Sequence, residues 1–245
     1  LVRDVHTPQI ATRHLVLSHE ITEAMKQEQF ELFYQPICEL ATGRIAGFEA
    51  LIRWQHPALG VISPLEFLWL AEQTGQIRDI GLWSLERACV DWPVLRAQSD
   101  HPTPFVSVNL SPSQLTDTGL VDQVSGILAR HHLPVSALKL ELTETVLINN
   151  PGMALDIFNR LIDLGSSIAL DDFGTGHSNL EVLHRYPLRT MKIDRSFVSE
   201  MLSTPHSARI VQSSIDLAHS LRMDVVAEGI EDEAQRSALM RLGCE

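Results

Sequence analysis

The stretch Ile168-Ala169-Leu170-Asp171-Asp172-Phe173-Gly174-Thr175-Gly176 decides how the rest of the chain is interpreted. It starts as an apolar run typical of a fully buried strand, which stops at two adjacent carboxylates and a glycine-rich turn. Adjacent carboxylates repel each other and are costly near a dry interior unless a cation lies between them. A metal site is therefore one interpretation of Asp171 and Asp172. A simple turn is the other, because Asp side chains often hydrogen-bond to nearby backbone in turns.

The composition is that of a globular protein with a sizeable core, since 44% of the 245 residues are hydrophobic and 20% are charged. A net charge of -12 argues against binding of long nucleic acid, which needs basic patches. The three cysteines, Cys38, Cys89 and Cys244, are widely spaced and indicate neither a disulfide framework nor a zinc site. They fit a reducing compartment such as the cytoplasm. No apolar run reaches the roughly 20 residues that cross a bilayer, so this region is expected to make no membrane contact itself.

Residues 1–17 form a polar lead without an initiator Met, and we interpret them as a linker from a longer parent protein that could carry a sensor or a membrane anchor. Residues 18–245 are expected to form one domain. Helical spacing predicts a first helix over residues 18–29 with Ser18 as its N-cap. Residues 30–40 and 44–54 predict two strands joined by a turn too short for a parallel crossover, hence an antiparallel hairpin. This pairing places Gln35 close to Glu49.

Beyond the hairpin and two helices over residues 65–74 and 80–97, strands and helices alternate regularly, which predicts a parallel sheet covered on both faces. Together with the hairpin the chain has seven expected strands, one fewer than an eight-stranded barrel needs. It stops at Gly243-Cys244-Glu245, where an eighth strand would begin. The expected strands are residues 105–110, 137–142, 167–170, 190–193 and 224–227, and the expected helices are residues 114–131, 153–164, 179–184, 208–221 and 233–242.

Polar side chains stand at the ends of the expected strands, which in a barrel meet at one rim. Singly, each has a plainer explanation: Asn109 could cap the next helix, Glu228 could belong to a turn, and Lys192 could be a surface residue. Each of these explanations requires exposure, and a strand in a helix-covered sheet has little exposed face. Taken together, the polar residues at the strand ends therefore favour a metal site. The set comprises Glu49, Asn109, Glu141, Glu144, Asp171, Asp172, Lys192, Asp194 and Glu228.

The charges of this set also favour bound cations. Two divalent ions together with Lys192 would neutralise the five carboxylates of Glu49, Glu141, Asp171, Asp172 and Glu228. Carboxylate and amide oxygens suit magnesium or manganese, whereas zinc sites favour His and Cys.

Seven short segments, in this order along the chain, are together far more specific than any one of them. They are Tyr34-Gln35-Pro36-Ile37, Glu49-Ala50-Leu51-Ile52-Arg53-Trp54, Asn109-Leu110-Ser111, Glu141-Leu142-Thr143-Glu144, Asp171-Asp172-Phe173-Gly174-Thr175-Gly176, Lys192-Ile193-Asp194 and Glu228-Gly229-Ile230-Glu231. On these segments the sequence resembles the EAL domain family of cyclic di-GMP phosphodiesterases, over essentially all of residues 18–245.

The resemblance implies an α/β fold, a modified TIM-type (β/α)8 barrel with an antiparallel first strand. The eighth strand, which carries a Gln-Gly pair in the family, and the last helix are missing from the chain as given, so the domain is expected to be C-terminally incomplete. The implied activity is hydrolysis of cyclic di-GMP, a bacterial second messenger, to linear 5'-pGpG. The resemblance further implies a homodimer and fused sensor or regulatory domains in the parent protein.

The resemblance also implies roles for individual residues. Glu49, Asn109, Glu141 and Asp171 would hold one metal ion, and Asp171 and Asp172 would reach a second. Glu228 and Lys192 would contact the ions and the attacking water, so that the implied catalytic residues are Glu49, Lys192 and Glu228. The implied substrate contacts are Gln35, Leu51, Arg53, Asp194 and Glu231, and the residues implied to couple the metal site to a dimer contact are Glu144, Phe173, Gly174, Thr175 and Gly176.

Some alternatives stay open. Arg53 could pair with a nearby acid instead of a phosphate, although its fork suits phosphate well. His177 and Asn179 stand where the family has Tyr and Ser, and we expect tuning from this difference. Calcium is expected to inhibit, because its longer bonds and looser geometry would misplace the nucleophile. A non-catalytic cyclic di-GMP receptor is the alternative function, but no predicted metal ligand is missing. An interpretation of residues 172–174 as the magnesium-binding motif of a protein kinase is excluded, because the sequence has no catalytic or glycine-rich kinase loop.

Overall fold

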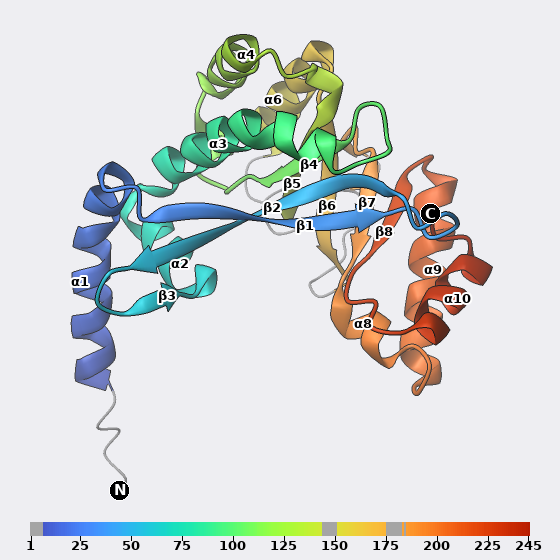
Figure 1. The fold of residues 1–245 in the computed structure, drawn as a ribbon. Helices are drawn as coiled ribbons and strands as arrows, with labels where there is room; N and C mark the ends of the chain where they lie inside the picture. The colour runs from blue at the N-terminus through green and yellow to red at the C-terminus, as the bar shows by residue number, and fades with distance from the viewer. Residues whose placement is uncertain (1–6, 144–150, 175–182, 184) are drawn as a thin grey trace, which may run out of the picture.

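The computed structural model describes residues 7–143, 151–174, 183 and 185–245 (Figure 1). One curled sheet runs through the domain, as the sequence predicts. Its spatial order is β1-β2-β4-β5-β6-β7-β8, with the short β3 paired to β2. β2 pairs with β1 and with β3 in antiparallel fashion, and the other neighbours, β2-β4-β5-β6-β7-β8, are parallel. The strands are β1 (Phe30–Cys38), β2 (Ile45–His56), β3 (Gly60–Ile62), β4 (Phe105–Asn109), β5 (Leu138–Thr143), β6 (Ser167–Phe173), β7 (Thr190–Ile193) and β8 (Asp224–Ala227).

The helices cover the outer side of this sheet, so the protein has an α/β fold shaped as a partial TIM-type barrel (Figure 1). Alternation along each strand separates two faces: Leu138, Leu140 and Leu142 of β5 are buried, while Lys139 and Glu141 between them face the opposite side. The apolar face packs against the helices in one large core. The helices flanking the parallel strands are α3 (Ile77–Ala97), α4 (Leu120–His131), α6 (Pro151–Leu164), α8 (Arg195–Glu200), α9 (Pro205–Ser220) and α10 (Glu233–Leu242).

A second, smaller core lies under the part of the β1–β2 hairpin that extends beyond the barrel. Trp54 is fully buried there, and its indole N–H donates to the side chain of Gln29 at 3.0 Å. His56 accepts from the backbone N–H groups of Ala58 and Leu59 through Nδ1, while its Nε2 lies 3.0 Å from Glu20. These contacts fix the hairpin against the two N-terminal helices, α1 (Thr7–Lys26) and α2 (Pro64–Thr74).

The predicted start of the first helix is wrong, because α1 begins at Thr7 and not at Ser18. The buried residues Leu17, Ile21 and Ala24 form one stripe that continues past Ser18. The Ser18 hydroxyl donates to the carbonyl of Leu15 at 2.9 Å, which satisfies the hydroxyl inside a helix.

Other differences concern short elements. β3 and α8 were not predicted, because three to six residues carry too little periodicity to be recognised. β6 continues past the predicted end at Leu170 to Phe173. The predicted helix over residues 179–184 lies, apart from residue 183, outside the described residues.

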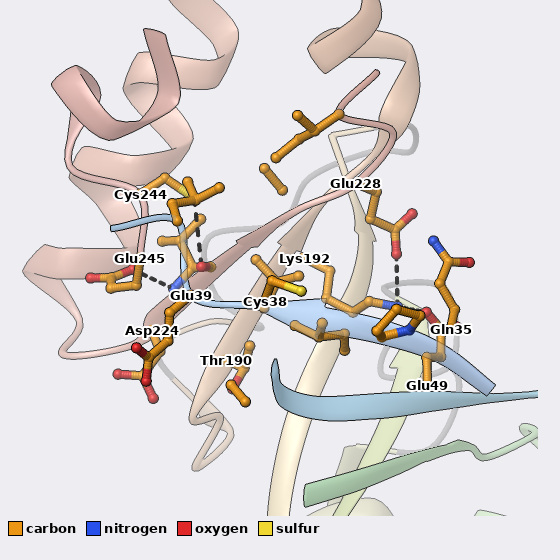
Figure 2. A pocket seen from close by; sticks show the side chains of 18 of the residues that line it. Gln35, Cys38, Glu39, Glu49, Thr190, Lys192, Asp224, Glu228, Cys244 and Glu245 are labelled. Carbon is orange, nitrogen blue, oxygen red and sulfur yellow. Dashed lines mark hydrogen bonds and ion pairs between the residues drawn. The ribbon is translucent and has the colours of Figure 1, made fainter. Parts of the chain in front are cut away.

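The sheet is open between β1 and β8 in the part of the chain that the structure describes. The last residue bridges the two edges: the backbone carbonyl of Glu245 accepts from the N–H of Leu40 at 2.6 Å, and its carboxylate accepts from the N–H of Val225 at 3.0 Å. A cavity of ≈ 470 Å³ lies between these edges and reaches Glu49, Lys192 and Glu228 at its other end (Figure 2). Among the described helices, none combines the length and the apolar character that a membrane crossing needs.

Candidate metal centre

Four carboxylates meet around one ammonium group on the inner face of the sheet. The Nζ atom of Lys192 lies 2.7 Å from Glu141, 2.8 Å from Glu228, 3.1 Å from Asp171 and 3.2 Å from Glu49. Lys192 and Glu141 are almost fully buried, and Figure 2 shows Glu49, on β2, and Glu228, just after β8, turned toward Lys192. These charges are therefore removed from most of the solvent, which strengthens every interaction among them.

The strands bring these residues together because each places an inward side chain near one rim of the sheet. The expectation that Glu49 ends its strand is wrong, because β2 continues past the barrel to His56 and Glu49 lies inside it. Glu141 lies beside Asn109 in the parallel register of β4 and β5, and Lys192 lies beside Val226 in that of β7 and β8. Glu228 follows β8 directly and continues its ladder by donating from its N–H to the carbonyl of Ile193 at 3.0 Å. The spacing of two along each strand therefore produces the cluster without any special loop.

Asp171 and Asp172 break this rule, since adjacent strand residues normally point to opposite faces. The register of β6 against β7 shifts between Leu170 and Phe173, which places both aspartates in a β-bulge. Asp172 adopts a left-handed backbone with φ 55°, and its N–H donates to the Asp171 carboxylate at 3.0 Å. Asp is among the residues that tolerate this conformation. The bulge turns both carboxylates toward the same centre.

The carboxylate oxygens fall into two groups that could each hold a cation. Oxygens of Glu49, Glu141 and Asp171 lie within 4.8 Å of one another, as do oxygens of Asp171, Asp172 and Glu228. Asp171 belongs to both groups, so it could bridge two ions. The Oε1 atom of Glu141 is buried without a hydrogen-bond partner among the described residues. An acceptor left unpaired in this position fits a cation ligand.

The electrostatics of the cluster follow from burial and mutual repulsion. Burial raises the pKa of Glu49, and the neighbouring carboxylates of Glu228 and Asp171 raise it further against the opposing effect of Lys192. Burial likewise raises the pKa of Glu141, Glu228 and Asp172. Burial alone would lower the pKa of Lys192, but its four carboxylate neighbours outweigh this and raise it. Full ionisation of these carboxylates is therefore unfavourable without further positive charge, and the site attracts cations.

The expected substrate contacts are spread around this centre. Gln35 faces Glu49 across the hairpin as predicted, and Leu51 and Arg53 follow Glu49 at every second position of β2. Arg53 forms no ion pair with a described residue; its guanidinium donates to the carbonyl of Ile52 at 2.8 Å. Asp194 is the N-cap of α8, where its carboxylate accepts from the N–H of Ser196 at 3.0 Å.

The residues expected to couple the metal site to a dimer contact are only partly described. Phe173 is buried at the end of β6, and Gly174 has φ 95°. A Cβ at Gly174 would lie 2.9 Å from the ring of Phe197, so the position requires glycine. Glu144, Thr175 and Gly176, together with His177 and Asn179, lie outside the described residues. Glu231, the remaining expected substrate contact, donates from its N–H to the side chain of Gln235 at 2.7 Å.

Two further side chains on the inner face, those of Lys139 and Phe33, were not predicted from the sequence. Lys139 lies two positions before Glu141, with its ammonium 3.0 Å from the Thr190 hydroxyl and 3.9 Å from the centre of the Phe105 ring. Burial lowers its pKa to about 8. Phe33 lies two positions before Gln35 and is half exposed. Both residues could have been predicted, because each lies two positions along a strand from a predicted site residue and therefore on the same face.

Comparisons with known proteins agree with this geometry. The family described as EAL domain matches residues 18–245. The bifunctional diguanylate cyclase/cyclic di-GMP phosphodiesterase MucR of Pseudomonas aeruginosa is 42% identical over 234 residues, covering 96% of this chain and 34% of MucR. The cyclic di-GMP phosphodiesterase RocR of the same organism is 36% identical over 236 residues, covering 96% of this chain and 60% of RocR. The chain thus spans about a third of MucR and three fifths of RocR.

Solved structures show the same fold. The chain superposes on the MucR phosphodiesterase in complex with c-di-GMP with a TM-score of 0.86 at 42% identity, covering 94% of this chain and 92% of that one. It superposes on the EAL enzyme Bd1971 in its cAMP and cyclic-di-GMP bound form with a TM-score of 0.90 at 36% identity, covering 96% of this chain and 64% of that one.

Proposed function

The chain belongs to the EAL domain family, and on this premise we propose that it is a metal-dependent phosphodiesterase that hydrolyses cyclic di-GMP to linear 5'-pGpG. The observation that carries the proposal is the inner-face cluster, in which two groups of carboxylate oxygens share Asp171. The names of MucR and RocR support the reaction, since both include cyclic di-GMP phosphodiesterase.

The donor set fits two ions of magnesium or manganese. Glu49, Asn109, Glu141 and Asp171 would hold one ion, and Asp171, Asp172 and Glu228 would hold or approach the other. All are oxygen donors, which these metals prefer. When bound, such a pair lowers the pKa of a water molecule and stabilises the charge on a leaving oxygen.

The residues of the chain would contribute binding and positioning. The ammonium of Lys192 carries three donors, and with four carboxylates around it the group stays protonated and can orient an attacking water. Glu49 and Glu228 would place that water from opposite sides of Lys192. Arg53 would bind a phosphate oxygen, because no ion pair with a described residue engages it. Gln35, Leu51, Asp194 and Glu231 complete the proposed substrate contacts.

A receptor that binds cyclic di-GMP without cleaving it is the second candidate. Such a protein has no need to retain every metal ligand, yet this chain has a carboxylate or amide at each proposed position: Glu49, Asn109, Glu141, Asp171, Asp172 and Glu228. The complete set favours the enzyme.

The setting of the domain is also a proposal. We infer that residues 1–17, of which residues 7–17 form the first part of α1, connect residues 18–245 to sensor or regulatory domains of a larger protein, as the partial coverage of MucR suggests. We also infer a homodimer whose contact involves residues 173–176 and Glu144, and a cytoplasmic location, which suits the free thiols of Cys38, Cys89 and Cys244.

The proposal is tested by incubating the protein with cyclic di-GMP and Mg²⁺, Mn²⁺, Ca²⁺ or a chelator, and separating the products. We expect pGpG with Mg²⁺ or Mn²⁺ and little with Ca²⁺ or the chelator. Glu49→Ala should abolish turnover, whereas Glu23→Ala, an exposed glutamate of α1, should leave it unchanged. Tight binding without product from the complete domain would favour the receptor, and full activity with Ca²⁺ alone would contradict the proposed chemistry.

A further inference from the structure

The side chain of Phe33 lies on the same face of the hairpin as the metal centre. Directly opposed residues of an antiparallel pair point to the same side, and the register pairs Phe33 with Leu51 and Gln35 with Glu49. Phe33 is 50% exposed, while Phe30 on the same strand is 5% exposed. A large aromatic ring is therefore presented to solvent on the face that carries Glu49.

Arg53 holds this ring in a defined arrangement. Its guanidinium lies over the Phe33 ring at 5.5 Å from the ring centre, and it is fixed by its hydrogen bond to the carbonyl of Ile52. Glu31, which opposes Arg53 across the hairpin, accepts a hydrogen bond from Gln55. The Arg53 guanidinium thus lies over one face of the Phe33 ring, and the ring remains half exposed.

The position of this surface suits a nucleotide. Two residues along a strand span about 7 Å, so the Phe33–Leu51 pair is one such step from the Gln35–Glu49 pair. A phosphate near Glu49 would leave an attached base within reach of the ring. The opposite face of the hairpin is filled by Ile52 and Trp54 of the smaller core, so the ring cannot withdraw into it.

We propose that Phe33, backed by Arg53, is a stacking subsite for a purine base of the substrate whose phosphodiester lies at the carboxylate cluster. This inference rests on the proposed function. A single base stacked on an aromatic side chain typically changes affinity by about tenfold or more, whichever base it is. Phe33 would therefore strengthen binding of the dinucleotide without touching the reacting atoms.

The test is steady-state hydrolysis of cyclic di-GMP by the wild type and by Phe33→Ala, Phe33→Leu and Phe33→Tyr. We expect KM to rise about tenfold in the Ala and Leu variants with kcat nearly unchanged, and to stay close to the wild-type value in the Tyr variant. Leu keeps the apolar area but lacks a ring, so it separates stacking from simple burial. Leu65→Ala, at an apolar residue of α2 that is 88% exposed, is the matched control and should change nothing.

These measurements distinguish a failure of the stacking subsite from a failure of the proposed function. No product from the wild type would contradict the proposed function itself. Product from the wild type together with equal KM values in the Ala, Leu and Tyr variants would overturn the stacking subsite. A fall in kcat at constant KM, or a Tyr variant as impaired as the Ala variant, would overturn it too. Melting temperatures of all variants show whether each is folded, and a half-exposed ring should tolerate truncation.

Discussion

At the scale of single residues, Lys192 balances a concentration of negative charge that no sequence motif reveals by itself. Its ammonium lies within 3.2 Å of four carboxylates, which come from β2, β5, β6 and the residue that follows β8. Each of these residues was predicted from its position at a strand end. Their common contact with one ammonium was not, because it depends on side-chain directions that only the folded sheet defines.

Replacing Lys192 by Met should destabilise the chelated protein strongly. Removing one partner of a buried ion pair leaves uncompensated charge and costs about 3–5 kcal/mol, which corresponds to a fall in melting temperature of about 10 °C for a domain of this size. Lys26→Met is the matched control, because Lys26 pairs with Glu23 at an exposed site where an ion pair contributes less than about 1 kcal/mol. Equal melting temperatures for the two variants would show that Lys192 does not hold the cluster together.

At the scale of elements, the strand boundaries were predicted better than the starts of the helices. Glu141 and Lys192 were predicted from their positions near strand ends, and the period of two along β5 and β7 places both on the inner face. The start of α1 was misplaced, because a serine that bonds within a helix resembles an N-cap in sequence. The bulge at Asp171 and Asp172 has no pattern of its own and depends on the pairing with β7.

The turn after β8 offers a test at this scale. Gly229 has φ 70°, and a Cβ there would lie 2.6 Å from the Cβ of Arg195. Gly229→Ala should therefore lower stability by more than the roughly 1–2 kcal/mol of left-handed backbone strain, and should displace Glu228 and reduce activity. Gly43→Ala isolates the backbone effect, since Gly43 has φ 72° with nothing within 4 Å of its Cβ position. Similar losses in both variants, measured by urea denaturation and turnover, would contradict a steric role for Gly229.

At the scale of the whole molecule, the net charge of -12 is concentrated in part at one buried centre. The alternation of strands and helices was sufficient to predict the curled parallel sheet, because covered parallel strands need crossover helices.

The raised pKa values of the centre predict an unusual dependence of stability on pH. Burial raises the pKa of Glu49, Glu141 and Glu228 in the folded state. As the pH falls, these carboxylates therefore bind protons at a higher pH in the folded protein than in the unfolded chain. This contribution to stability is complete below the ordinary glutamate range and is lost as pH rises through the folded pKa. The chelated protein should therefore melt at a higher temperature near about pH 5 than near about pH 8.

Two comparisons isolate this effect from other titrating groups. Glu49→Gln removes one of the raised carboxylates, so its melting temperature should change less between the two pH values than that of the wild type. Mg²⁺ binds the ionised carboxylates, so the stabilisation that it adds should grow as pH rises. The partly exposed Glu39, Glu66 and Glu86 have lowered pKa values, so they affect stability only at lower pH. Identical pH profiles for the wild type and Glu49→Gln would contradict the assignment.

The most direct test of the central claim is to hydrolyse cyclic di-GMP in ¹⁸O-labelled water with Mg²⁺ and determine the mass of the product. If the carboxylate cluster directs water onto phosphorus, the product is pGpG with one labelled oxygen in its 5'-phosphate, and Glu49→Gln forms none. Unlabelled product, or labelled product formed at the wild-type rate by Glu49→Gln, would contradict the claim.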